Sequence, residues 1–166
     1  MANQKQHKQL EIYLDYYNQK YPTQNNRIIQ GLCAFGIGLA VLGISWALPF
    51  PHIGFLGQYN SYFNWASFII AISIYYYSTL SPLLSYMMIF LALIFTYLIS
   101  LIEKQFPDHY QMAGLFILVL LLSLLLHYQH NKKISNNNSV KIELGFIWIG
   151  PIWILSLMLK KFRIKF

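Results

Sequence analysis

Residues 28–102 decide the fold. They read IIQGLCAFGIGLAVLGISWALPFPHIGFLGQYNSYFNWASFIIAISIYYYSTLSPLLSYMMIFLALIFTYLISLI, a run of 75 residues without a Lys, Arg, Asp or Glu. A soluble domain of this size needs surface charge to stay in water, whereas a charge inside a bilayer is costly. A helix needs about 20 apolar residues to cross the hydrocarbon, so the run has room for about three crossings. The sequence therefore predicts a membrane protein.

Composition and charge agree with this prediction. Hydrophobic residues make up 57% of the 166 residues and charged residues 10%, whereas soluble domains carry about one-quarter charged residues. The net charge of +7 comes from basic clusters that flank the apolar segments, where they contact anionic lipid heads. Membrane lipids are therefore the expected partners, and nucleic acid is not. The single cysteine, Cys33, lies inside the first apolar segment, so no disulfide framework is expected.

The pattern predicts one all-α membrane domain, a multi-pass helical bundle of residues 1–166. Residues 1–27 form a cytoplasmic amphipathic segment, with an apolar stripe of Leu10, Tyr13, Leu14 and Tyr17. Four spans fit within residues 28–130, namely 28–48, 62–80, 83–102 and a fourth that starts at residue 111 and runs out near residue 130. In the first span, the pairs Ala34/Gly38 and Gly36/Ala40 would allow close contact between helices.

The last apolar stretch, residues 142–159 before a basic tail that ends at residue 166, contains Gly150 and Pro151. We expect the backbone to break or kink there, because proline has no amide hydrogen and clashes with a continuing helix. If the stretch folds back as a re-entrant or interfacial segment, eleven of the twelve Lys and Arg lie inside and only Lys104 lies outside. If it crosses fully as a fifth span, the division is seven against five. The positive-inside rule favours the folded-back segment, with both termini cytoplasmic. We expect residence in a bacterial inner membrane.

Two histidines at the end of the fourth span are the candidate metal ligands. His127 and His130 stand at i and i+3, so both can face one ligand. Ferrous sites need two or three imidazoles, or two and a carboxylate, and His7 or Glu143 could complete the set from the same side of the membrane. The alternative is that the histidines are ordinary polar residues where a helix meets water. No catalytic residue is identified from the residues themselves.

Several short motifs follow one another along the chain. They are Leu14-Asp15-Tyr16-Tyr17, Asn26, Trp46-Ala47-Leu48-Pro49-Phe50-Pro51, Tyr76-Tyr77 with Leu80-Ser81, His130, and Gly150-Pro151-Ile152-Trp153. In this order and spacing the chain resembles a family of small multi-pass membrane proteins, formerly a domain of unknown function. Its fungal member is a ferrous-iron 2-hydroxy fatty acid dioxygenase of the endoplasmic reticulum.

The resemblance implies an iron-dependent dioxygenase that shortens 2-hydroxy fatty acids by one carbon, which is fatty acid α-oxidation. The family places histidines where this chain has Tyr21, Gln30 and His130, around Asn26. Two readings follow: an iron enzyme in which His127 helps His130, or a degenerate member that binds lipid or a partner protein without metal. If iron binds, Tyr21 and Gln30 should lie near the histidines. A transporter is disfavoured, because the span centres lack ionisable residues and the chain shows no repeat.

Overall fold

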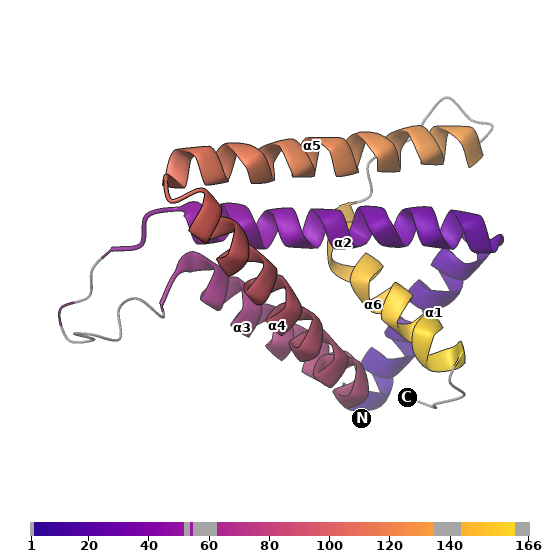
Figure 1. The fold of residues 1–166 in the computed structure, drawn as a ribbon. Helices are drawn as coiled ribbons and strands as arrows, with labels where there is room; N and C mark the ends of the chain where they lie inside the picture. The colour runs from indigo at the N-terminus through magenta and orange to yellow at the C-terminus, as the bar shows by residue number, and fades with distance from the viewer. Residues whose placement is uncertain (1, 52–53, 55–62, 135–143, 162–166) are drawn as a thin grey trace.

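The computed structural model describes residues 2–51, 54, 63–134 and 144–161. Within these ranges the chain is helical and has no strand, which confirms an all-α membrane helical bundle. The described residues form six helices, whose arrangement is shown in Figure 1. They are α1 (Ala2–Lys20), α2 (Gln24–Ala47), α3 (Trp65–Leu80), α4 (Pro82–Gln105), α5 (His109–Ile134) and α6 (Leu144–Lys161).

The helix ends follow local sequence signals. The Thr23 side chain caps α2 by accepting from the Asn26 amide, and the helix ends just before Pro49. The second predicted span begins at Trp65 rather than at residue 62, because Asn64 and Ser67 form a reciprocal capping box at that point. Pro82 then begins α4, where its missing amide hydrogen costs no hydrogen bond.

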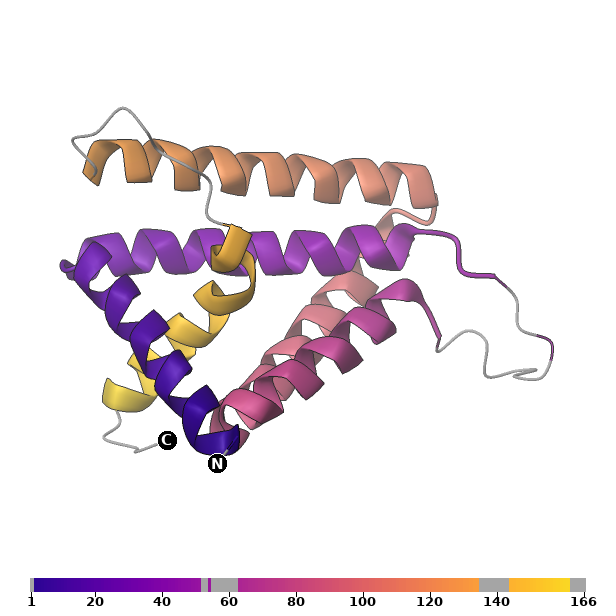
Figure 2. The same cartoon turned by 180° about the vertical axis from the view of Figure 1, so that it is seen from behind.

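Helices α2, α4 and α5 are long and apolar enough to cross a membrane, whereas α3 and the apolar part of α6 are shorter. Helices α2 and α5 lie antiparallel and side by side along their length (Figure 1). Helices α3 and α4 form a second antiparallel pair that leaves α2 obliquely, and α1 and α6 occupy the other side (Figure 2).

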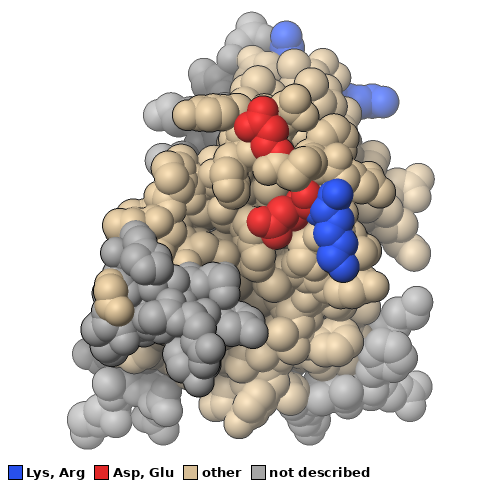
Figure 3. Space-filling model, turned by 60° about the vertical axis from the view of Figure 1, so that its left-hand side comes forward, with Lys and Arg blue, Asp and Glu red and all other residues tan. Residues whose placement is uncertain are grey.

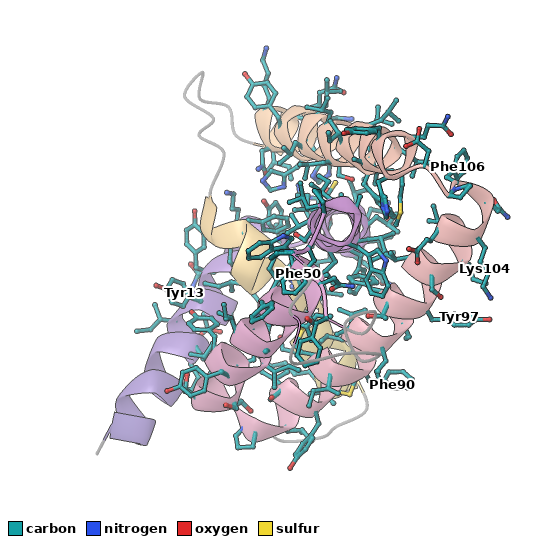
Figure 4. All side chains as sticks on the ribbon, turned by 90° about the vertical axis from the view of Figure 1, so that its left-hand side faces the viewer. Tyr13, Phe50, Phe90, Tyr97, Lys104 and Phe106 are labelled. Atoms are coloured by element: carbon teal, nitrogen blue, oxygen red, sulfur yellow. The ribbon has the colours of Figure 1, made fainter. Side chains whose placement is uncertain are left out.

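The outer surfaces of these helices suit a lipid environment. Phe90 and Tyr97 of α4 point away from the bundle (Figure 4), and both side chains are more than half exposed. Leu118, Leu121 and Leu125 of α5 are similarly exposed. Charged side chains are few on the face shown in Figure 3, where uncharged residues predominate. Apolar side chains facing outward in this number are expected for helices solvated by lipid tails.

Helix α1 packs against the bundle through the predicted stripe, with one exception. Leu10, Leu14 and Tyr17 are buried in the same core cluster as Trp153 of α6. Tyr13 is 46% exposed and points away from the bundle in Figure 4, so it is the stripe residue that does not face the core. Three of the four stripe residues are therefore buried.

Helix α6 corrects the prediction at Gly150 and Pro151. The helix runs without interruption from Leu144 to Lys161, with Pro151 inside it, so the predicted break and the re-entrant fold-back at Gly150 and Pro151 are wrong. A Cβ on Gly150 would lie 3.1 Å from Cβ of Ala34, so the missing side chain permits a close approach of α6 to α2. Packing against α2 holds the helix together across the proline, as neighbouring helices commonly do in membranes. The single helix is compatible with the interfacial segment and with the fifth span.

Small residues of α2 face different neighbours. A Cβ added to Gly38 would meet Phe95 of α4, and a Cβ added to Gly36 would meet Ser123 of α5. The predicted small-residue pairs therefore do allow close contact, with α2 at the centre of the bundle.

Candidate functional site

The ends of α2 and α5 bring together four of the residues singled out from the sequence. Gln30 lies in the second turn of α2, and His127 and His130 lie near the end of the antiparallel α5. Tyr21 lies between α1 and α2 and reaches the same place. Asn131, one turn after His127, completes the group. We call these five residues the polar cluster.

Hydrogen bonds join all five members of the polar cluster. Tyr21 Oη donates to Asn131 Oδ1 at 2.7 Å, and Asn131 Nδ2 lies 3.1 Å from His127 Nε2. The other ring nitrogen of His127, Nδ1, lies 2.6 Å from Gln30 Oε1. Gln30 Nε2 lies 2.8 Å from His130 Nδ1 and 3.4 Å from Asn131 Oδ1. The two histidines are thus linked through the Gln30 amide.

The directions of these bonds follow from the chemistry of the groups. An amide oxygen only accepts, so His127 Nδ1 must carry the hydrogen that reaches Gln30 Oε1. In the neutral ring His127 Nε2 then accepts from Asn131 Nδ2. The two hydrogens of Gln30 Nε2 are directed to His130 Nδ1 and Asn131 Oδ1. Donors and acceptors therefore match with both histidines neutral.

The polar cluster is buried beneath aromatic side chains of α6. Gln30 is 0% exposed and His127 is 2% exposed. The Phe146 ring stacks on His127 with centroids 4.3 Å apart, and the Trp153 ring lies 5.4 Å from that of Tyr21. A polar group buried without a partner would be costly. No buried side-chain nitrogen or oxygen lacks one among the described residues.

The residues present do not fit the predicted pair of iron ligands. Both ring nitrogens of His127 face amide groups, so binding iron there would require breaking a buried hydrogen bond. The described residues contain no group of three or more His, Cys, Asp and Glu that could hold a metal. His130, half-buried, is the histidine with a nitrogen, Nε2, outside these bonds. Glu143 and the side chain of His7 lie outside the described residues.

Asn26 and Asn131 differ from what the sequence suggested. Asn26 belongs to the cap of α2 through its backbone amide, 3.4 Å from Thr23 Oγ1, and it is not a member of the polar cluster. The predicted fourth span runs out near residue 130, but α5 continues to Ile134 and buries Asn131. The available signal was its i, i+4 spacing from His127, which puts both side chains on one helix face.

Two concave regions lie near α2. An apolar cavity of about 100 Å³ is lined by residues of α2, α3 and α4, among them Gly38, Ile70 and Phe95. A larger groove of about 860 Å³ opens between the first half of α2 and the end of α6. It combines Arg27 and Lys160 with apolar side chains. We call it the α2–α6 groove.

Comparison with known proteins adds no relative. No protein-family model matches this chain, and neither a curated protein nor a solved structure matches it.

Proposed function

We propose that this chain is a multi-pass membrane protein that binds membrane lipid without a metal. The observation that carries the proposal is the Gln30 amide, which lies between His127 and His130 and bonds to both rings. The amide occupies one ring nitrogen of each histidine with a hydrogen bond, so neither of these nitrogens is available to a metal. On this proposal the polar cluster fastens α1, α2 and α5 together, and the lipid binds elsewhere on the bundle.

The lipid-binding part of the proposal is supported by the α2–α6 groove. The groove has cationic residues and apolar walls, which are the two surfaces that an amphiphile requires. It lies beside the polar cluster, because Arg27 and Gln30 are one turn apart on α2.

An iron-dependent dioxygenase acting on a 2-hydroxy fatty acid is the second candidate. One observation favours it: positions 21, 30 and 130, where the resembling family has histidines, lie together at one end of the bundle. Ferrous iron bound there would supply oxygen activation. Of this chain's residues, His130 would bind through Nε2, and His127 would first have to leave its amide partners. The carboxylate of a fatty acid would be held by the cations of the nearby groove.

Iron content distinguishes the two candidates. Protein purified anaerobically in detergent, with ferrous iron supplied, should retain no iron and should not turn over 2-hydroxy fatty acids. The double variant Tyr21→His plus Gln30→His restores imidazoles at the family positions, so it should gain iron. Adding His130→Ala to that variant should remove the iron again. One iron per wild-type chain, lost in His130→Ala alone, would reject the metal-free proposal.

We place both termini on the cytoplasmic side of a bacterial inner membrane. The Gln24 end of α2 lies beside the basic last turn of α5, and Lys160 lies at the same end. Glu103 and Lys104 lie at the Trp46 end. Reporter fusions after residue 166 and before residue 1 should both score as cytoplasmic, and an opposite score at residue 166 would establish a crossing by α6.

A further inference from the structure

We infer that the α2–α6 groove is the binding site for an anionic phospholipid, with the phosphate between Arg27 and Lys160 and one acyl chain along the apolar wall. This inference rests on the proposed lipid-binding function and specifies its ligand. The first argument is charge. The groove has two cations and no carboxylate among its described lining residues. Two cations that line one groove attract a group with more than one negatively charged oxygen.

The polar side chains of the groove are positioned to donate. Arg27 Nε donates to the Tyr21 carbonyl oxygen at 2.9 Å, which anchors the guanidinium and leaves its terminal nitrogens for a ligand. Asn18 Oδ1 accepts from Trp153 Nε1 at 3.0 Å, so its amide nitrogen is the part that remains for the groove. A phosphate accepts several such bonds at once, whereas a single carboxylate has fewer oxygens to offer.

The apolar side chains of the groove start next to its two cations, where the acyl chain of a lipid would leave the phosphate. Leu32 and Phe35 lie five and eight residues after Arg27 on α2, about 7.5 Å and 12 Å farther along the helix axis. Met158 of α6 lines the groove opposite them. Helices α2 and α6 run antiparallel here, since Gly31 faces Ile154 and Ala34 faces Gly150. Lys160 therefore lies at the depth of Arg27, where the lipid heads are, and the apolar residues lie deeper.

The wall also has room for a chain. Ile154 packs on Gly31 at the floor of the groove, and Leu32 beside them remains 67% exposed. An exposed leucine that lines a groove between two helices is what a lipid tail would cover.

Native mass spectrometry of the detergent-purified full chain tests the inference. The chain is titrated with dioleoyl phosphatidylglycerol, dioleoyl phosphatidylcholine and oleic acid. Wild-type protein should retain one phosphatidylglycerol in preference to the other two. Lys160→Gln should weaken that binding by about fivefold and Lys160→Glu by more, since each cation near the surface contributes on that scale. The matched control is Lys132→Gln plus Lys133→Gln, which removes two exposed cations outside the groove and should change the affinity less.

Each contrary outcome has a different meaning. If wild-type protein binds none of the lipids, the proposed lipid-binding function fails with the inference. If it binds phosphatidylglycerol but Lys160→Glu binds equally well, only the groove assignment fails. Preference for oleic acid would overturn the phospholipid and point to a fatty acid. A melting curve for each variant, expected to match wild type, shows that a lost lipid is not a lost fold.

Discussion

The two ends of the α2–α5 pair are held by different chemistry. At one end, the Gln30 amide is hydrogen-bonded to His127 and His130. At the other end, Gly43 lets the Phe116 ring lie directly on the α2 backbone, with no polar group in the contact. Lipid tails are as apolar as leucine, so helices in a membrane gain little from burying apolar surface and rely on close packing or on polar bonds. The α2–α5 pair is held by polar bonds at the Gln30 end and by close packing at the Gly43 end.

The difference teaches what each end contributes. Because the two helices are antiparallel, residues later in α2 contact residues earlier in α5. The three contacts along the pair are Gln30 with His127, Gly36 with Ser123, and Gly43 with Phe116. Directional hydrogen bonds fix which residues face one another, because a shifted register would leave buried donors unpaired. The glycine contact fixes the distance between the helices. A change at Gly43 should therefore affect stability most, and changes in the polar cluster should affect it less.

The largest effect is expected for Gly43→Leu. A Cβ at this position would overlap the Phe116 ring, so the helices must separate or the ring must leave its site. Such overpacking costs about 3 kcal/mol at the upper end of the usual range. Unfolding of the detergent-purified protein, followed by circular dichroism, would show an earlier transition.

Gly114→Ala is the matched control for that variant. No atom lies within 4 Å of a Cβ added at Gly114 of α5, so this helical glycine should gain about 0.5–1 kcal/mol on becoming alanine. Adding Phe116→Ala to Gly43→Leu should return part of the lost stability. Equal stability of Gly43→Leu and wild type would show that the Phe116 contact does not hold the pair together.

An intermediate effect is expected for Gln30→Leu. The substitution keeps the approximate volume but leaves His127 Nδ1 and His130 Nδ1 without their amide partner. A buried group left unpaired costs about 1–3 kcal/mol, and the cost inside membranes lies toward the low end of that range. The measurement is the same unfolding transition.

Gln129→Leu makes the identical chemical change at an exposed position of α5, so it should leave the transition unmoved. The combination of Gln30→Leu with His127→Phe removes both partners of one bond and should be less destabilising than the sum of the two single changes. Additive costs would show that the Gln30–His127 bond contributes nothing to the pairing of α2 and α5.

The sequence predicted the helices well where hydropathy alone determines them. The run without charged residues contains almost all of α2 and α4 and the whole of α3, and the predicted second span began only three residues early. It failed at Gly150 and Pro151, because the effect of a proline depends on the neighbour that supports the helix. That neighbour, Ala34, lies more than a hundred residues away in the chain.

The candidate site was predicted in position but not in full. The sequence placed Tyr21 and Gln30 beside the two histidines, since the start of the first span and the end of the fourth were expected on one face of the membrane. It missed Asn131, because the end of α5 is set by burial against α2 and not by hydropathy. The role of the histidines as iron ligands stays a prediction. Hydrogen-bond partners between helices depend on register, which a single sequence does not give.

The smallest effect is expected for Tyr21→Phe, which tests the outermost bond of the polar cluster. The change removes the hydroxyl that donates to Asn131 Oδ1 at 2.7 Å, while Gln30 Nε2 still reaches that oxygen at 3.4 Å. The ring should keep its place against Tyr17 and Trp153, and the Tyr21 carbonyl should still accept from Arg27. We therefore expect a loss of about 1 kcal/mol, the net contribution of one hydrogen bond.

The control is Tyr128→Phe, which removes a hydroxyl from an exposed tyrosine of α5 next to His127. It should cost less stability than Tyr21→Phe. Tyr21→Phe in the Gln30→Leu background sharpens the comparison between the two ends. If the polar cluster acts as one network, the second change should cost more than in wild type, because Asn131 Oδ1 has already lost Gln30 as a donor and then loses Tyr21 as well. The same loss in both backgrounds would mean that Tyr21 holds Asn131 independently, and the cluster would then be a set of separate bonds.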